Sequence, residues 1–179
     1  MSLPHEVLFT TAYNQLSSLI VKVEPSLLPC AQPQPFPFAL QKGFYYKFDR
    51  HAVHTAVNNA FIKLFESSGY TGKLEQLQQY RNVAGRVDAV AVNDFNVCSF
   101  EFDTGIHIKK KSVEKVINLY TKLPSDKNYY GFLCVRGSAE FDKKCFAETI
   151  RRINSLRPPA DINLYIIYLS SNYITKYKP

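Results

Sequence analysis

The 179-residue sequence lacks the short motifs that assign many enzyme classes directly. It contains no G-x-x-x-x-G-K-[ST], G-x-G-x-x-G, G-x-S-x-G or H-E-x-x-H pattern, so these phosphate-loop, dinucleotide, hydrolase and zinc-protease signatures are excluded. The four cysteines form no C-x-x-C pair, which excludes the usual spacing of a structural zinc site. Cys98 and Cys134 lie in apolar runs, where a free thiol behaves as a small core residue.

Long hydrophobic runs are also missing. No apolar stretch approaches the ~18 residues that a membrane-spanning helix requires. The N-terminus shows no hydrophobic stretch led by Lys or Arg, as a secretory signal would. With reduced thiols expected as well, we predict a cytoplasmic protein without a membrane partner.

Positive charge is concentrated in one part of the chain. The formal net charge is +7, with an excess of +1 over residues 1–79 and +6 over residues 80–179. A basic C-terminal half favours polyanionic partners, chiefly nucleic acid and, second, an acidic membrane surface, although a solvated basic surface would have the same composition.

Hydrophobic periodicity predicts one α/β domain over residues 1–179. An N-terminal helix (4–23) and a Pro-rich arm (25–37) would occupy residues 1–48, with a short strand at 43–48. The core would span 49–169 and a tail 170–179. Core helices are expected after Asp49, over 112–122 and over 141–156, with a weaker helix or loop at 73–81. Strands are expected at 86–92, 97–103, 129–135 and 163–169. This order predicts a mixed sheet with helices on both faces.

A β-hairpin carries the acids of greatest interest. Residues 86–92 and 97–103 read as strands, and a turn centred on Asp94 and Phe95 would set Asp88 opposite Glu101. Directly opposed side chains have Cβ atoms roughly 4.5–5.5 Å apart. Two carboxylates that close repel each other unless a proton or a cation lies between them.

The same register sets Arg86 opposite Asp103, so three acids and one arginine would share a patch of an otherwise apolar sheet. Carboxylate oxygens are the ligands that Mg²⁺ and Mn²⁺ prefer. The alternative is structural: Arg86 and Asp103 would form a cross-strand ion pair, with Asp88 and Glu101 solvated at the open end of the sheet.

Gly85-Arg-Val-Asp88, followed by Ser99-Phe-Glu-Phe-Asp103, resembles the PD-(D/E)XK nuclease superfamily. The resemblance extends over about residues 50–169, since a helix, an acidic hairpin, a helix and a strand follow one another. It implies a restriction-endonuclease-like fold, a Mg²⁺ or Mn²⁺ ion held by Asp88 and Glu101, and activity on DNA. A homodimer is also compatible with it, because many enzymes of this fold act as dimers.

The superfamily pattern places its catalytic lysine where this chain has Asp103. Asp103 could act as a third metal ligand or replace the lysine, as acids and amides do in some restriction enzymes. Alternatively, the lysine could come from the following helix, where Lys109, Lys110, Lys111 and Lys115 are available, and Lys110 or Lys111 is the predicted contributor. The start of that helix could equally be a solvated basic surface.

The helix before the hairpin offers Glu66, Asn58 and Asn59 as further candidates, none with a decisive claim. His51 and His54 lie one helical turn apart, but without a third ligand nearby they favour an exposed polar face.

The sequence thus predicts a metal-dependent DNA phosphodiesterase with Asp88, Glu101, Asp103, Lys110 and Lys111 at its site. The alternative is a nuclease-fold domain that has lost activity and binds nucleic acid or a protein. A purely structural subunit is a third possibility.

Overall fold

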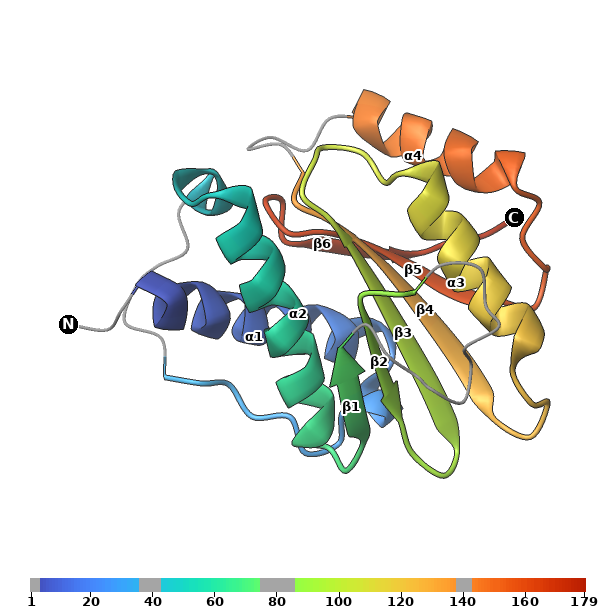
Figure 1. Cartoon of the computed structure of the whole chain (residues 1–179), viewed down its shortest axis with the longest axis horizontal. Helices are drawn as coiled ribbons and strands as arrows, with labels where there is room; N and C mark the ends of the chain where they lie inside the picture. Colours follow the sequence, from blue (N-terminus) through green and yellow to red (C-terminus); the bar gives the residue numbers. More distant parts are fainter. Residues whose placement is uncertain (1–3, 36–42, 75–85, 138–142) are drawn as a thin grey trace.

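The computed structural model describes residues 4–35, 43–74, 86–137 and 143–179 (Figure 1). The α-helices are α1 (Pro4–Val23), α2 (Arg50–Glu66), α3 (Lys110–Lys122) and α4 (Lys143–Ser155), and two short 3₁₀ helices are η1 (Pro25–Leu27) and η2 (Phe44–Lys47). The strands are β1 (Thr71–Leu74), β2 (Ala89–Val92), β3 (Asn96–Asp103), β4 (Asn128–Val135), β5 (Asn163–Tyr168) and β6 (Tyr173–Lys176).

All six strands form one mixed sheet in the order β1-β2-β3-β4-β5-β6. Strands β1, β2 and β3 form an antiparallel meander. Strands β3, β4 and β5 run parallel because α3 and α4 connect them as crossovers, and β6 returns antiparallel along β5. The predicted α/β class with a mixed sheet is confirmed.

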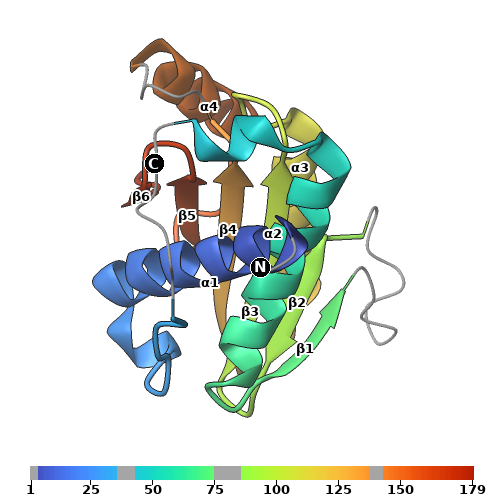
Figure 2. The same ribbon diagram turned by 90° about the vertical axis from the view of Figure 1, so that its left-hand side faces the viewer.

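Helices cover both faces of the sheet, which buries the central strands on both sides (Figures 1 and 2). Cys98, Phe100 and Phe102 of β3 point into the core formed with α1 and α2. Val97, on the opposite face of β3, packs in a second core with residues of α3 and α4. By alternation, Ser99, Glu101 and Asp103 also face α3, so three polar residues lie in an otherwise apolar layer.

Local sequence signals explain the helix boundaries that were predicted best. Pro4 begins α1, and the predicted range of 4–23 is confirmed. The Asp49 side chain accepts a hydrogen bond of 2.9 Å from the Ala52 N–H, so it caps α2 as expected. Beyond the end of that helix, Gly69 adopts the left-handed conformation with φ +86°.

The strand predicted at 43–48 is wrong. Gly43 has φ 74°, and its carbonyl accepts a hydrogen bond from the Tyr46 N–H, which turns the chain into η2. The buried Arg136 side chain donates to the Tyr45 and Phe48 carbonyls and holds this turn against the sheet. A tertiary contact therefore overrides the strand preference of the local aromatic residues.

Both edge strands were missed by the sequence patterns. Residues 73 and 74 belong to β1, while 75–81 of the weakly predicted helix lie outside the described residues. Residues 170–179 are not merely a tail, because β6 pairs with β5. Each edge strand has four residues and mixed burial, so neither gives a clear alternating pattern.

No helix in the described ranges is both long and apolar enough to cross a membrane. All four cysteines are free thiols, and Cys98, Cys134 and Cys145 are buried. Burial raises the pKa of the Cys98 and Cys134 thiols, as expected for inert core residues.

Candidate functional site

The hairpin has the predicted register. Val92 pairs with Val97 and Ala89 with Phe100, so the turn is centred on Asp94 and Phe95. The Asn93 side-chain oxygen accepts hydrogen bonds from the N–H groups of Phe95 and Asn96, at 3.0 and 2.7 Å, which stabilises the tight turn. Counting outward along this register leads to Asp88 and Glu101.

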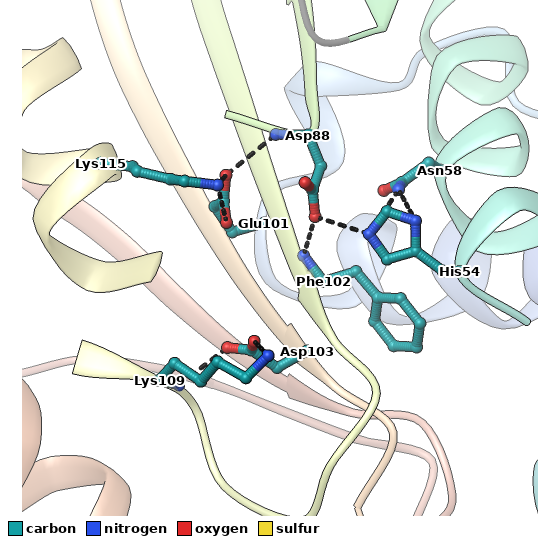
Figure 3. A network of polar contacts seen from close by, with 8 residues as sticks. All are labelled: His54, Asn58, Asp88, Glu101, Phe102, Asp103, Lys109 and Lys115. Carbon is teal, nitrogen blue, oxygen red and sulfur yellow. Dashed lines mark hydrogen bonds and ion pairs between the residues drawn. The ribbon is translucent and has the colours of Figure 1, made fainter. Parts of the chain in front are cut away.

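At that point, side chains replace the ladder between β2 and β3. The Asp88 N–H donates to Glu101 Oε1 at 2.9 Å, and the Phe102 N–H donates to Asp88 Oδ2 at 2.9 Å. Asp88 therefore accepts the Phe102 N–H, which a regular ladder would have paired with a carbonyl of the neighbouring strand, and Glu101 accepts the Asp88 N–H. This exchange holds the two acids together at the open end of the hairpin (Figure 3).

Lys115 of α3 reaches the same place from the helix that covers this face. Its ammonium lies 3.0 Å from Glu101 Oε1 and 3.1 Å from Oε2, and the Lys115 side chain is 19% exposed (Figure 3). The chain thus supplies its own cation beside the paired carboxylates. Lys115 lies three residues after Ser112 and four residues before Leu119, and both of these residues are buried. This helical spacing predicts that the Lys115 side chain shares the face of α3 that covers the sheet.

The pKa values of the two acids are shifted in opposite directions. Burial and the nearby Asp88 charge raise the pKa of Glu101 to about 8, despite the opposing effect of Lys115. Burial also acts to raise the pKa of Asp88, but hydrogen bonds from His54 and the Phe102 N–H, with the charges of His54 and Lys115, leave it lowered. Asp88 therefore favours its ionised form, whereas Glu101 holds a proton more tightly than a free carboxyl group.

Asp103 belongs to a different contact. Its carboxylate accepts the Lys109 N–H at 2.8 Å and lies 3.5 Å from the Lys109 ammonium, so it stabilises the start of α3 (Figure 3). The predicted pairing of Asp103 with Arg86 does not form. Strand β2 begins only at Ala89, and Arg86 is exposed with no ion pair to any residue that the structure describes.

His54 and Asn58 of α2 approach Asp88 from the other face of the sheet. His54 Nε2 lies 3.2 Å from Asp88 Oδ2, and Asn58 Nδ2 lies 3.2 Å from His54 Nδ1. The His54 ring also packs on Phe102, with 5.9 Å between ring centroids. The prediction that His54 belongs to an exposed polar face is therefore incomplete, because its side chain contacts Asp88. Their spacing of four residues places His54 and Asn58 on one helical face.

Lys110 and Lys111 lie in the first turn of α3 and are exposed. Neither forms an ion pair with Asp88, Glu101 or Asp103 in the described structure. The structure thus brings Asp88 and Glu101 together with Lys115, and leaves Lys110 and Lys111 on the surface beside them.

No protein-family model matches this chain, and a search of the curated proteins found no match. Two acids with separated pKa values and an adjacent, partly buried lysine form a perturbed ionisable cluster, which is typical of functional sites.

Replacing Glu101 by Gln is expected to stabilise the protein at alkaline pH. Since the pKa of Glu101 rises from 4.5 to about 8 on folding, the folded state binds more protons than the unfolded chain between these values. Wild-type stability should therefore fall as pH rises through this window. At about 1.4 kcal/mol per pKa unit, the shift sets an upper limit of about 5 kcal/mol.

Urea unfolding at pH 5 and pH 9 measures this effect. We expect the free energy of unfolding of Glu101→Gln, relative to that of the wild type, to be higher at pH 9 than at pH 5. Asp94→Asn at the exposed hairpin turn is the control and should show no such change. Equal pH dependence of Glu101→Gln and wild type would contradict the assignment of this proton to Glu101.

Proposed function

We propose that the protein is a metal-dependent nucleic-acid phosphodiesterase, an endonuclease acting on DNA. The observation that carries the proposal is the contact of Lys115 with Glu101, beside Asp88. A lysine adjacent to two paired acids is the arrangement that the PD-(D/E)XK resemblance requires, and here α3 supplies it in place of position 103.

The order of elements supports a restriction-endonuclease-like fold. Helix α2 precedes the antiparallel meander β1-β2-β3, and α3 leads to β4 parallel to β3. The resemblance implies a helix, an antiparallel hairpin that carries the acids, a second helix and a further strand. Asp88 lies just before β2 and Glu101 lies within β3.

Asp88 and Glu101 fit the donor set for Mg²⁺ or Mn²⁺. Mg²⁺ is commonly held by one or two carboxylates, with waters and substrate phosphate completing its octahedron. The described residues contain no group of three His, Cys, Asp or Glu placed to hold an ion, which disfavours a closed all-protein site. His54 Nε2 is engaged in a hydrogen bond with Asp88, and the Asp103 carboxylate is engaged by Lys109. When bound, a divalent ion would polarise the scissile phosphate and lower the pKa of a coordinated water.

The charged residues of the chain supply the remaining chemistry. Lys115 would orient the attacking water and balance the negative charge that develops on the phosphate in the transition state. Asp88 and Glu101 are held in place by the backbone groups of the hairpin, so their positions do not depend on substrate. His54 would fix the orientation of the Asp88 carboxylate.

Incubation with branched, single-stranded and duplex DNA in the presence of Mg²⁺ or Mn²⁺ tests the proposal. We expect cleavage of at least one substrate and its loss with EDTA. Absence of cleavage of all three DNAs with both ions would overturn the enzymatic assignment.

Lys110 and Lys111 are expected to contact the phosphate backbone without reading sequence. The double variant Lys110→Gln/Lys111→Gln should reduce the slope of log affinity against log salt by about 2, since each phosphate contact contributes about 0.9. Fluorescence anisotropy with duplex DNA at several salt concentrations measures the slope. Lys22→Gln/Lys63→Gln removes equal charge from α1 and α2 on the opposite side of the sheet and should leave the slope unchanged.

A second function is favoured by the aspartate at position 103. The chain would then be a nuclease-fold domain that binds nucleic acid or a protein without cleaving it, with Lys115 serving as the permanent counter-ion of Glu101. Calorimetric titration with Mn²⁺ separates the two functions, because the inactive scaffold would bind no ion at the hairpin. The buried thiols favour a reducing, cytoplasmic location for either function.

A further inference from the structure

A pair of buried hydroxyl groups lies beneath α3, next to the residue that carries the candidate lysine. Tyr129 of β4 donates a hydrogen bond from its hydroxyl to the Val116 carbonyl of α3, at 3.0 Å. Its oxygen also lies 2.5 Å from Ser99 Oγ of β3. Ser99 is completely buried and Tyr129 is 4% exposed, so water does not compete for these bonds.

The direction of these bonds follows from the number of protons. A tyrosine hydroxyl has one proton, and Tyr129 uses it on Val116. Ser99 must therefore donate to the Tyr129 oxygen. The result is a directed chain from β3 through β4 to the backbone of α3, and it ends at the residue that follows Lys115.

Close packing adds a second constraint at the same place. Gly131 of β4 pairs with Ser99 of β3. A Cβ atom at position 131 would lie 2.6 Å from Val116 Cγ1, closer than real contacts allow. The glycine therefore lets α3 approach the sheet at the turn of helix that carries Lys115.

We infer that Ser99, Tyr129 and Gly131 are positioning residues that hold Lys115 of α3 against Glu101 of β3. Ser99 lies two residues before Glu101 on the same face of β3, while Val116 directly follows Lys115. One short chain of hydrogen bonds thus links the strand that carries Glu101 to the helix that carries Lys115. The expected effect on cleavage rests on the proposed function, but the geometric coupling does not.

The fold contains a matched control for this arrangement. Tyr168 of β5 is also buried, and its hydroxyl donates to Thr149 Oγ1 of α4 at 2.9 Å. Tyr168→Phe therefore removes a buried anchor between the sheet and a helix on the same face, but that helix carries none of the candidate site residues. A general loss of helix anchoring would affect both tyrosine variants alike.

A double-mutant cycle in thermal unfolding at pH 9 tests the coupling without reference to activity. We expect the change in midpoint caused by Lys115→Met to be at least halved in a Tyr129→Phe background and unchanged in a Tyr168→Phe background. Equal changes in the two backgrounds would overturn the inference. If Tyr129→Phe does not fold, Ser99→Ala/Tyr129→Phe removes both hydroxyls, leaves no buried donor unpaired, and takes its place in the cycle.

Cleavage kinetics provide the second test. We expect Tyr129→Phe to lower kcat about tenfold with KM unchanged in the wild-type background and to cause little further loss in a Lys115→Met background, while Tyr168→Phe retains the wild-type rate. Additive losses would contradict a positioning role. If the unfolding cycle shows the coupling but the wild-type protein cleaves no DNA, the proposed function is refuted and the positioning inference remains intact.

Discussion

Asp88→Asn is expected to reduce DNA cleavage by at least about 100-fold, because outer-shell partners of metal ligands alone contribute roughly 10–100-fold. The substituted amide oxygen can still accept the Phe102 N–H, so the fold of the hairpin should be retained. What is lost is the negative charge of the acid that is ionised at neutral pH. Mn²⁺ binding should weaken in parallel with activity.

Single-turnover cleavage and calorimetric titration with Mn²⁺ measure the two effects on the same preparations. Asp94→Asn makes the same chemical change at the exposed turn of the hairpin and should retain wild-type cleavage and Mn²⁺ binding. Cleavage by Asp88→Asn at the wild-type rate would remove Asp88 from the proposed site.

Lys115→Met is expected to lower the cleavage rate by about 10²–10⁴-fold, the usual contribution of a positioned proton-transfer or charge-stabilising group. The substitution preserves most of the apolar stem of the side chain and removes the ammonium that contacts both Glu101 oxygens. Mn²⁺ affinity should not fall, since a competing cation has been removed from the carboxylate. Loss of rate with retained metal binding is therefore the expected signature.

Lys110→Met is the matched control, because it removes the same charge from the exposed first turn of α3. We expect it to weaken DNA binding and to leave the single-turnover rate at saturating enzyme nearly unchanged. A large loss of that rate in Lys110→Met, with Lys115→Met fully active, would transfer the catalytic role to the start of the helix. Wild-type cleavage rates in both variants would favour Asp103 in place of the catalytic lysine.

Much of the hairpin could be predicted because its determinants are local. Asn93 forms the turn with the neighbouring Phe95 and Asn96 N–H groups, and a two-residue turn sets every pair that follows. The approach of Asp88 to Glu101 could therefore be found by counting. The same count failed for Arg86 and Asp103, since the ladder ends at Ala89.

The partners of the acids could not be predicted in the same way. Four lysines lie in or just before the first half of α3. Helical spacing favours Lys115 for the face that covers the sheet, but its distance to Glu101 depends on the rotation and height of the helix above the sheet. Packing at Gly131 and the Tyr129 hydrogen bond define that placement. His54 reaches Asp88 only because α2 crosses the opposite face of the same hairpin.

The sequence by itself determined the α/β class, the main helices and central strands, the hairpin register and the pairing of Asp88 with Glu101. These features depend on periodicity and turn chemistry over a few residues. Only the tertiary structure decided that Asp103 accepts the Lys109 N–H just before α3, that Lys115 is the cation at Glu101, and that His54 contacts Asp88. Those contacts join elements distant along the chain, and their geometry arises from packing of the helices onto the two faces of the sheet.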